Sequence, residues 1–286
     1  MLAITLAICL PVFSVVLFKE FDRFKINTLH AIVFNYLGAI IIGLLLLVTP
    51  QSLVSSLDTP YLLETILVGF LFLFNFFLIA KTAQLRGVSF ATFANKMSIG
   101  IPILVTVFWF DELISTSKTI GVLLTFISIY FITKNKKENK NSSKIIWLPV
   151  AVFVFTGIAE TLINVTQKEY FKPASGDISN FVISAFLFSF IFGVTILLFQ
   201  FKKIHFKSVL AGLVLSIPNT LGVYYFVKCL NNFEDSTSIL PVLHIGSLVL
   251  SIFIGFLLYK DKLSFYNWIG MALAFTAIFY LQISIW

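Results

Sequence analysis

The chain has 286 residues, of which 59% are hydrophobic and 12% charged, and it carries a net charge of +7 and 34 phenylalanines. A soluble globular domain has about twice that charged fraction, so the composition excludes a soluble protein. The apolar residues form helix-length runs rather than alternating segments of about ten residues, which excludes a lipid-facing β-barrel. We therefore expect an all-α integral membrane protein.

Ten apolar stretches are long enough to cross a bilayer. A helix rises 1.5 Å per residue, so about 20 apolar residues cover a hydrocarbon core of about 30 Å. No basic residue precedes the first stretch and no small-x-small cleavage site precedes Lys19, so we expect a span there rather than a removable signal peptide. In chain order the predicted spans are roughly 1–18, 28–49, 60–81, 88–110, 118–133, 145–167, 179–200, 208–229, 236–259 and 265–286.

The lysines and arginines are concentrated in alternate loops. Fifteen of the twenty lie in loops that follow odd-numbered spans, and four lie in loops that follow even-numbered spans. By the positive-inside rule, the odd loops should be cytoplasmic and both termini should face outward. The remaining basic residue, Lys96, lies inside a span.

A basic linker at 134–144 divides the chain into two halves, 1–133 and 145–286, with five predicted spans each. A shift of 149 residues aligns Ser89–Phe131 with Ser238–Tyr280 without a gap and gives nine identities. Because five is odd, the second half enters the membrane from the opposite side, so the halves are predicted to be inverted repeats. Inverted repeats are the usual architecture of alternating-access carriers, which bind their substrate near the midplane.

Two short patterns also recur in the halves. They are the acidic-ended turns Asp111-Glu112-Leu113 and Asp261-Lys262-Leu263, and the Ile-Gly pairs at 120–121 and 269–270. Together with the five-plus-five layout, they resemble the drug/metabolite transporter (DMT) superfamily, EamA type, over the whole chain. The resemblance implies ten helices, a central cavity lined mainly by the first, third, fourth, sixth, eighth and ninth, and secondary transport of amino acids, sugars, nucleotides or drugs. Many members are read as having cytoplasmic termini, whereas the charge distribution here predicts the reverse.

Lys96 and Glu160 are charged residues predicted to lie deep within spans. An ionised residue at mid-span costs about 2.5–3.5 kcal/mol on insertion scales, so it is expected to be paired or functional. Lys96 lies beside Asn95 in the fourth span, and Glu160 shares one face of the sixth span with Asn164. We predict that they line the path of substrate or protons. An ion pair that only joins the two helices is the alternative.

Other polar residues in the spans complete the candidate site. A buried side-chain amide has several hydrogen-bonding groups to satisfy, which favours a functional role for the amides of the third and eighth spans. The repeat shift places His244 opposite Asn95, with a packed histidine as the alternative, and serine stripes more often join helices than bind substrates. The candidate substrate-binding or coupling residues are Asn75, Asn95, Lys96, Glu160, Asn164, Asn219, Tyr224, His244 and Ser247.

The fifth and tenth spans carry stripes of small residues that permit close approach of helix backbones. We expect these stripes to pack within the bundle, and a homodimer seam is the alternative. The stripes are Gly121, Thr125 and Ser128 in the first half, and Gly270, Ala274 and Ala277 in the second.

The chain lacks the sequence motifs of common enzymes. It contains no His-Glu-x-x-His, Gly-x-Ser-x-Gly or Gly-x-x-x-x-Gly-Lys motif, and its acidic residues do not cluster as metal ligands would. We therefore expect no enzymatic activity, catalytic residue, cofactor or metal.

These patterns predict a multi-pass transporter of a bacterial inner membrane. Its expected function is secondary active export of small metabolites such as amino acids by alternating access, with protons as the candidate coupling ion. An uptake carrier or facilitator for sugars or nucleotides, and a channel-like protein, are the alternatives. The expected partners are a small-molecule substrate, the lipid bilayer and protons, without nucleic acid, and the protein is expected to be a monomer or a homodimer.

Overall fold

The computed structural model describes residues 2–56, 58–109, 116–133, 147–171, 177–200, 203–232, 236–260 and 264–283. Throughout these ranges the regular secondary structure is α-helical. The basic linker 134–144 and the acidic-ended turns 111–113 and 261–263 lie outside the described residues, so their structure stays a prediction.

Each predicted span corresponds to one helix or, in one case, to two. A short additional helix, α3, lies between the second and third spans, where Thr49 caps a turn that begins with Pro50. The described helices are α1 (Leu2–Arg23), α2 (Thr28–Leu46), α3 (Pro50–Ser55), α4 (Leu62–Arg86), α5 (Val88–Met97), α6 (Gly100–Trp109), α7 (Thr116–Thr133), α8 (Trp147–Tyr170), α9 (Asp177–Gln200), α10 (Phe206–Asn232), α11 (Ser236–Tyr259) and α12 (Phe265–Ile283).

Seven helical segments in the described part of the chain are long and apolar enough to cross a bilayer. They are α1, α2, α4, Val88–Val105, α8, Ile178–Gln200 and Phe206–Phe226. Shorter apolar helical stretches cover Thr119–Phe131, Leu243–Tyr259 and Phe265–Tyr280. Large apolar side chains on these helices are exposed, including Leu198, Phe199, Phe253 and Phe256, as expected of surfaces that face lipid. The chain is therefore a multi-pass, all-α membrane protein, and its crossing the membrane ten times stays a prediction.

The fourth predicted span, 88–110, is interrupted by a two-residue turn at 98–99 that separates α5 from α6. Pro102 has no backbone N–H, and its ring crowds the carbonyl of Ser98, four residues earlier. The Ser98 hydroxyl can donate a hydrogen bond to the Asn95 carbonyl (2.5 Å), an acceptor left free at the end of α5. The break therefore falls next to the predicted Asn95 and Lys96 pair.

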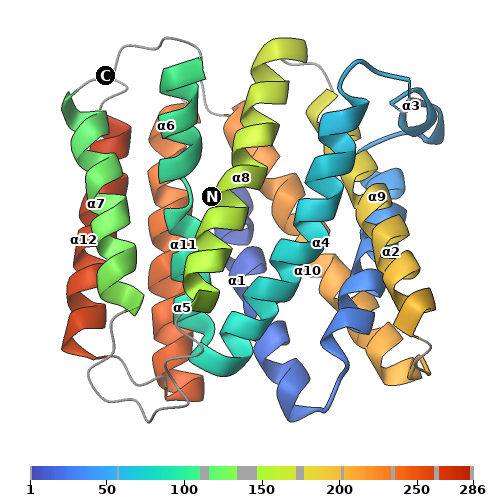
Figure 1. Cartoon of the computed structure of the whole chain (residues 1–286), viewed down its shortest axis with the longest axis horizontal. Helices are drawn as coiled ribbons and strands as arrows, with labels where there is room; N and C mark the ends of the chain where they lie inside the picture. Colours follow the sequence, from blue (N-terminus) through green and yellow to red (C-terminus); the bar gives the residue numbers. More distant parts are fainter. Residues whose placement is uncertain are drawn as a thin grey trace.

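The helices lie side by side in one bundle, with α7 and α12 at one edge and α2 and α9 at the other (Figure 1). Their packing repeats when α1 is exchanged with α8, α2 with α9, α4 with α10, α5–α6 with α11, and α7 with α12. The exchange turns the α2–α10 pair into α4–α9 and the α1–α10 pair into α4–α8. It turns the α1–α11 pair into the packing of α8 against α5 and α6. Both members of each exchanged set are in contact. One extensive pair breaks the pattern: α1 packs against α4, whereas α8 and α10 form no comparable contact in the described residues.

Glycines allow the closest of these approaches. A Cβ on Gly212 of α10 would lie 2.3 Å from the Ala31 carbonyl oxygen of α2, and a Cβ on Gly69 of α4 would lie 2.8 Å from the Ala185 carbonyl oxygen of α9. Both contacts are with backbone atoms, which cannot move aside as the end of a side chain can. The α2–α10 and α4–α9 pairs therefore share the same device for close packing.

The small-residue stripes are buried where α7 packs against α12. Thr125, Ser128, Ala274 and Ala277 have no exposed surface, and the hydroxyls of Thr125 and Ser128 donate to carbonyls of their own helix. This arrangement within one chain supports the packing interpretation of these stripes.

Candidate functional site

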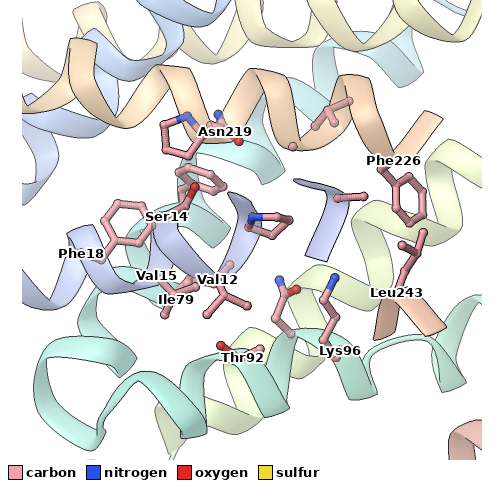
Figure 2. Close-up of a pocket in the computed structure, with 17 residues that line it drawn as sticks. Val12, Ser14, Val15, Phe18, Ile79, Thr92, Lys96, Asn219, Phe226 and Leu243 are labelled. Atoms are coloured by element: carbon pink, nitrogen blue, oxygen red, sulfur yellow. The ribbon is translucent and has the colours of Figure 1, made fainter. Parts of the chain in front are cut away.

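A cavity of about 250 Å³ lies between α1, α4, α5, α10 and α11. Apolar side chains form most of its wall, and the polar residues Ser14, Thr92, Asn95, Lys96 and Asn219 interrupt that wall. Figure 2 shows Lys96 and Thr92 on one helix, Asn219 on the helix opposite, and Ser14 on α1 between them. The cavity therefore takes residues from both predicted halves of the chain.

Lys96 is half-buried and contributes to the cavity wall just before the break that ends α5. Its accessible surface therefore faces an internal space lined by α1, α10 and α11. No carboxylate oxygen among the described residues lies within 4.0 Å of its ammonium nitrogen. The position suits a cation that meets a ligand, because a charge at membrane depth is costly unless it faces a polar or water-filled space.

Glu160 lies on α8 and is not among the residues that line this cavity. Its carboxylate lies 3.0 Å from the hydroxyl of Ser98, in the turn between α5 and α6. That hydroxyl has one proton, so it donates either to Glu160 or to the Asn95 carbonyl. The Glu160 and Lys96 charges lie within electrostatic range of each other, but they do not form a contact ion pair in this conformation. Their direct pairing in another conformation stays a prediction.

Three helices meet in a small polar network behind the cavity. The Asn75 side chain of α4 donates to the hydroxyl of Thr156 on α8 (2.8 Å), and Thr156 can in turn donate to the Asn75 carbonyl oxygen (3.1 Å). Asn95 of α5 also approaches the Thr156 hydroxyl, at 3.5 Å. Asn75 is thereby satisfied in the interior, and Asn95 is held beside Lys96 at the cavity wall.

Asn219 lines the cavity from α10, next to Pro218 in the interior of that helix. Its amide donates to the Asn35 side-chain oxygen of α2 at 3.4 Å. The Asn35 amide nitrogen is buried and has no acceptor among the described residues. The two amides therefore fix the α10 wall of the cavity to α2.

The remaining predicted residues lie outside the wall of this cavity. His244 is buried on α11 within electrostatic range of Lys96, and its Nδ1 has no partner in the described part of the chain. The Ser247 hydroxyl donates to the Leu243 carbonyl one turn earlier (2.7 Å), so it is used within its own helix. Tyr224 packs against Tyr225, with ring centroids 5.0 Å apart, and Asn164 is half-buried on α8.

No residue of α1 was predicted to belong to the site, although this helix supplies six of the residues that line the cavity. Pro11 and Ser14 were the available signals, since a proline and a serine one turn apart are unusual inside an apolar span. Thr92 of α5, which also lines the cavity, was not predicted either. Conversely α8, the sixth predicted span, contributes no residue to this cavity, although the family resemblance places it in the lining.

Hydrogen bonds close the bundle at the end where α1 and α4 terminate, which we call the basic end because Lys19, Arg23, Lys25 and Lys81 lie there. Lys19 of α1 donates to the backbone carbonyl of Gln84 on α4 (2.9 Å). The Gln84 amide donates to the Phe18 carbonyl (3.1 Å) and to the Thr28 hydroxyl of α2 (2.9 Å). Phe18 itself lines the cavity, so these bonds hold its boundary on the basic-end side.

A further bond at this end joins α1 to α11, where the Tyr259 hydroxyl donates to the Glu20 carboxylate (2.7 Å). Toward the other end of the cavity, an apolar cluster is built on Ala7, Cys229 and Leu243. Ala7 and Leu243 also belong to the cavity wall. The cavity therefore has a hydrogen-bonded boundary at the basic end and a smaller, apolar boundary at the opposite end.

The described residues contain no group of three or more His, Cys, Asp or Glu side chains placed to hold a metal ion. No family model matches the chain. A protein of Haemophilus influenzae, described as uncharacterized, is 26% identical to it over an alignment of 279 residues that covers 92% of this chain and 91% of the relative. The similarity extends over nearly the full length of both chains and names no activity.

Proposed function

We propose that the protein is a secondary active transporter that moves a small metabolite through the cavity between α1, α4, α5, α10 and α11. The observation that carries the proposal is Lys96, a cation that faces an internal cavity next to a helix break at membrane depth. Broken helices that present polar groups to a cavity between two halves are a common form of substrate site in secondary transporters. The proposed setting is a bacterial inner membrane, the compartment expected of a multi-pass carrier.

The repeated packing of the helices supports an inverted-repeat architecture of ten spans. Pairs such as α2–α10 and α4–α9 exchange when the two predicted halves are exchanged. The shared glycine contacts of Gly212 and Gly69 add a second correspondence that does not depend on the sequence alignment. This architecture is the one expected from the resemblance to the drug/metabolite transporter superfamily, which we retain as part of the proposal.

The one unmatched pair suggests how access alternates. α1 and α4 pack together and close the basic end, whereas α8 and α10 are not packed together in the described residues. If the two halves exchange conformations, α8 and α10 close on each other while α1 and α4 separate, and the cavity then opens to the basic end. With the basic end in the cytoplasm, the conformation described here is closed to the cytoplasm.

Proton coupling is assigned to Glu160, whose carboxylate lies beside the Ser98 hydroxyl at the helix break. In the proposed cycle, protonation of Glu160 removes the negative charge that lies within electrostatic range of Lys96. Without that charge nearby, the Lys96 ammonium binds the carboxylate of a small metabolite more tightly, so protonation of Glu160 and binding of the metabolite are coupled. Amino acids are the first substrate class that this assignment suggests, because they combine a carboxylate with a variable apolar part.

Counterflow in proteoliposomes tests the carrier function. Vesicles loaded with an unlabelled metabolite mixture should accumulate a labelled member of that mixture transiently, because a carrier exchanges substrate across the membrane in both directions. A channel gives no such transient accumulation and does not saturate in the same way. Labelled amino acids and labelled organic acids are the first compounds to test, and absence of counterflow for both sets, with the protein folded in the vesicles, would refute the carrier proposal.

A further inference from the structure

The charges in the cavity wall are distributed unevenly. Its described lining contains one cation, Lys96, and no carboxylate; Glu160 lies beside Ser98, outside the lining. On α11, the ionisable side chain within electrostatic range of Lys96 is His244, which is a base and adds no negative charge. From this we infer that the cavity binds a small organic monocarboxylate anion with an apolar body, in preference to a zwitterion or a cation. The inference rests on the proposed transport function and replaces amino acids, the first substrate class suggested above, with monocarboxylate anions.

The donors available to a ligand gather at one end of the wall. The Ser14 and Thr92 hydroxyls already donate to the Leu10 and Val88 carbonyls of their own helices (3.2 and 3.1 Å). Asn219 donates to another side chain across the α2–α10 contact. The Lys96 ammonium, with three N–H groups and no carboxylate within 4.0 Å in the described residues, is therefore the principal donor. A carboxylate placed there gains charge-assisted hydrogen bonds.

The ammonium group of an amino acid has no equivalent partner in this wall. Asn219, on the face of the cavity opposite Lys96, offers a neutral amide (Figure 2). A bound ammonium would lose its hydration without meeting an opposite charge, which is costly in an apolar enclosure. The same wall accepts the body of an anion readily, because Phe18, Phe76 and Phe226 supply aromatic surface.

The volume and the single charge set further limits. The cavity holds about 250 Å³, which is below the range of roughly 300–1,000 Å³ typical of sites for drug-sized ligands. One ammonium matches one carboxylate, so a nucleotide with several phosphate charges would leave most of its charge unpaired. The cavity therefore fits a compound of the size of an aromatic or branched-chain carboxylic acid.

Four compounds of one shape separate the classes: 3-phenylpropionate as the anion, 3-phenylpropanamide as the neutral form, phenylalanine as the zwitterion and phenethylamine as the cation. We would measure their binding to the purified protein in lipid nanodiscs by isothermal titration calorimetry. The expected result is that 3-phenylpropionate binds about tenfold or more tightly than its amide, the effect of one charge-assisted interaction, and more tightly than phenylalanine. Equal or tighter binding of phenylalanine or phenethylamine would overturn the inference, as would absence of binding by all four.

Two substitutions locate the effect. Lys96→Met removes the charge at similar length and should abolish the preference for 3-phenylpropionate over its amide. Lys228→Met is the matched control, because Lys228 is an exposed lysine of α10 outside the cavity lining. Retention of the preference in folded Lys96→Met would contradict the assignment, and if that variant does not fold, the ranking of the four compounds on the wild-type protein still decides.

Asn219→Asp provides a gain of function. It places a carboxylate opposite Lys96, where the unpartnered amide nitrogen of Asn35 can donate to it. Phenylalanine should then bind more tightly than 3-phenylpropionate. If the folded variant keeps the wild-type ranking, the lack of a carboxylate in the wall is not what disfavours the zwitterion.

Counterflow of the same compounds separates this inference from the proposed function. Binding of 3-phenylpropionate without counterflow would refute the carrier while leaving the anion site in place. Counterflow of phenylalanine without binding or counterflow of 3-phenylpropionate would keep the carrier and overturn the anion site.

Discussion

The α1–α4 pair and the α8–α10 pair occupy equivalent places in the repeated packing but differ in contact. α1 and α4 are joined through Lys19, Gln84 and Phe18, whereas α8 and α10 form no comparable packing in the described residues. By contrast, the α2–α10 pair and the equivalent α4–α9 pair have similar glycine contacts. The difference therefore lies at the ends of the cavity rather than in the framework around it. It indicates which parts of the bundle would rearrange and which would stay packed.

Another contrast concerns the helices that the repeat shift of 149 residues aligns. α5 and α6 are separated by a turn before Pro102, whereas α11 is continuous and has Ser251 at the aligned position. A serine retains its backbone N–H, so the helix continues, and the Ser251 hydroxyl donates to the Leu248 carbonyl (2.8 Å). The two helices also touch, because Ser89 of α5 donates to the Ser251 carbonyl (3.2 Å). The helix break beside Lys96 therefore has no counterpart in α11.

The largest expected effect follows removal of the two ionisable groups near that break. Lys96→Met and Glu160→Gln should each abolish proton-driven transport, a loss of about 100-fold or more if an interaction of about 3 kcal/mol with a charged group is removed. Glu160→Gln should retain exchange of substrate for substrate, which needs no net proton movement. Flux into proteoliposomes under an imposed pH gradient measures both activities.

The double variant sharpens this test. If Lys96 and Glu160 only join α5 to α8, removing both charges should restore folding and transport together, because no unpaired charge remains. If they couple protons to transport, the double variant should fold and remain inactive. A folded double variant that transports at the wild-type rate would eliminate the coupling role.

The next effect concerns the packing that the two halves share. Gly212→Ala and Gly69→Ala place a methyl group against backbone atoms of α2 and α9, and each should destabilise the fold by about 1–3 kcal/mol. Gly222→Ala is the matched control on α10, since its Cβ would meet Pro11 and Leu10 at ordinary distances of 3.5 and 3.6 Å. Thermal unfolding of the purified proteins in detergent compares the three. Equal stability of Gly212→Ala and Gly222→Ala would show that the close approach at Gly212 is not required.

A smaller effect is expected at the helix break. Pro102→Ala restores a backbone N–H that can donate to the Ser98 carbonyl, so α5 and α6 should join into a helix more like α11. Stability should rise slightly, while transport should fall because Lys96 and the Ser98 hydroxyl are displaced relative to Glu160. Unfolding temperature and counterflow rate, measured on the same preparation, give the two signs. If the unfolding temperature and the counterflow rate both rise, the helix break is not required for transport.

The sequence predicted the long helices well because apolar length is a strong signal and depends little on tertiary contacts. Three of the polar residues predicted for the site, Asn95, Lys96 and Asn219, line the cavity; they could be singled out because polar groups inside apolar spans are few. The sequence could not predict which helix faces meet, and it therefore missed Thr156, which satisfies Asn75 from α8. A threonine in an apolar span is ordinary, and only its position across from an amide makes it informative.

The contributions of α1 and of Gln84 were missed for a related reason. Gln84 lies near the end of α4, where a polar residue is expected whether or not it has a role. Its importance comes from two hydrogen bonds to residues 66 and 56 positions away in the chain. Contacts of that sequence separation depend on how helices pack, which hydropathy and charge patterns do not specify.

The central claim is that the cavity is reached from one side at a time and that the basic-end bonds control which side. A cysteine at position 14 reports on this directly, because Ser14 lines the cavity. In a background with Cys9 and Cys229 replaced by alanine, Ser14→Cys would be labelled with a membrane-impermeant maleimide in vesicles of each orientation. The account predicts labelling mainly from the side opposite the basic end. Gln84→Ala removes the bonds to Phe18 and Thr28 and should shift labelling toward the basic-end side, whereas Ser55→Ala in the exposed α3 turn, the control, should not. Equal labelling from both sides in the unmodified background, or no shift in folded Gln84→Ala, would contradict it.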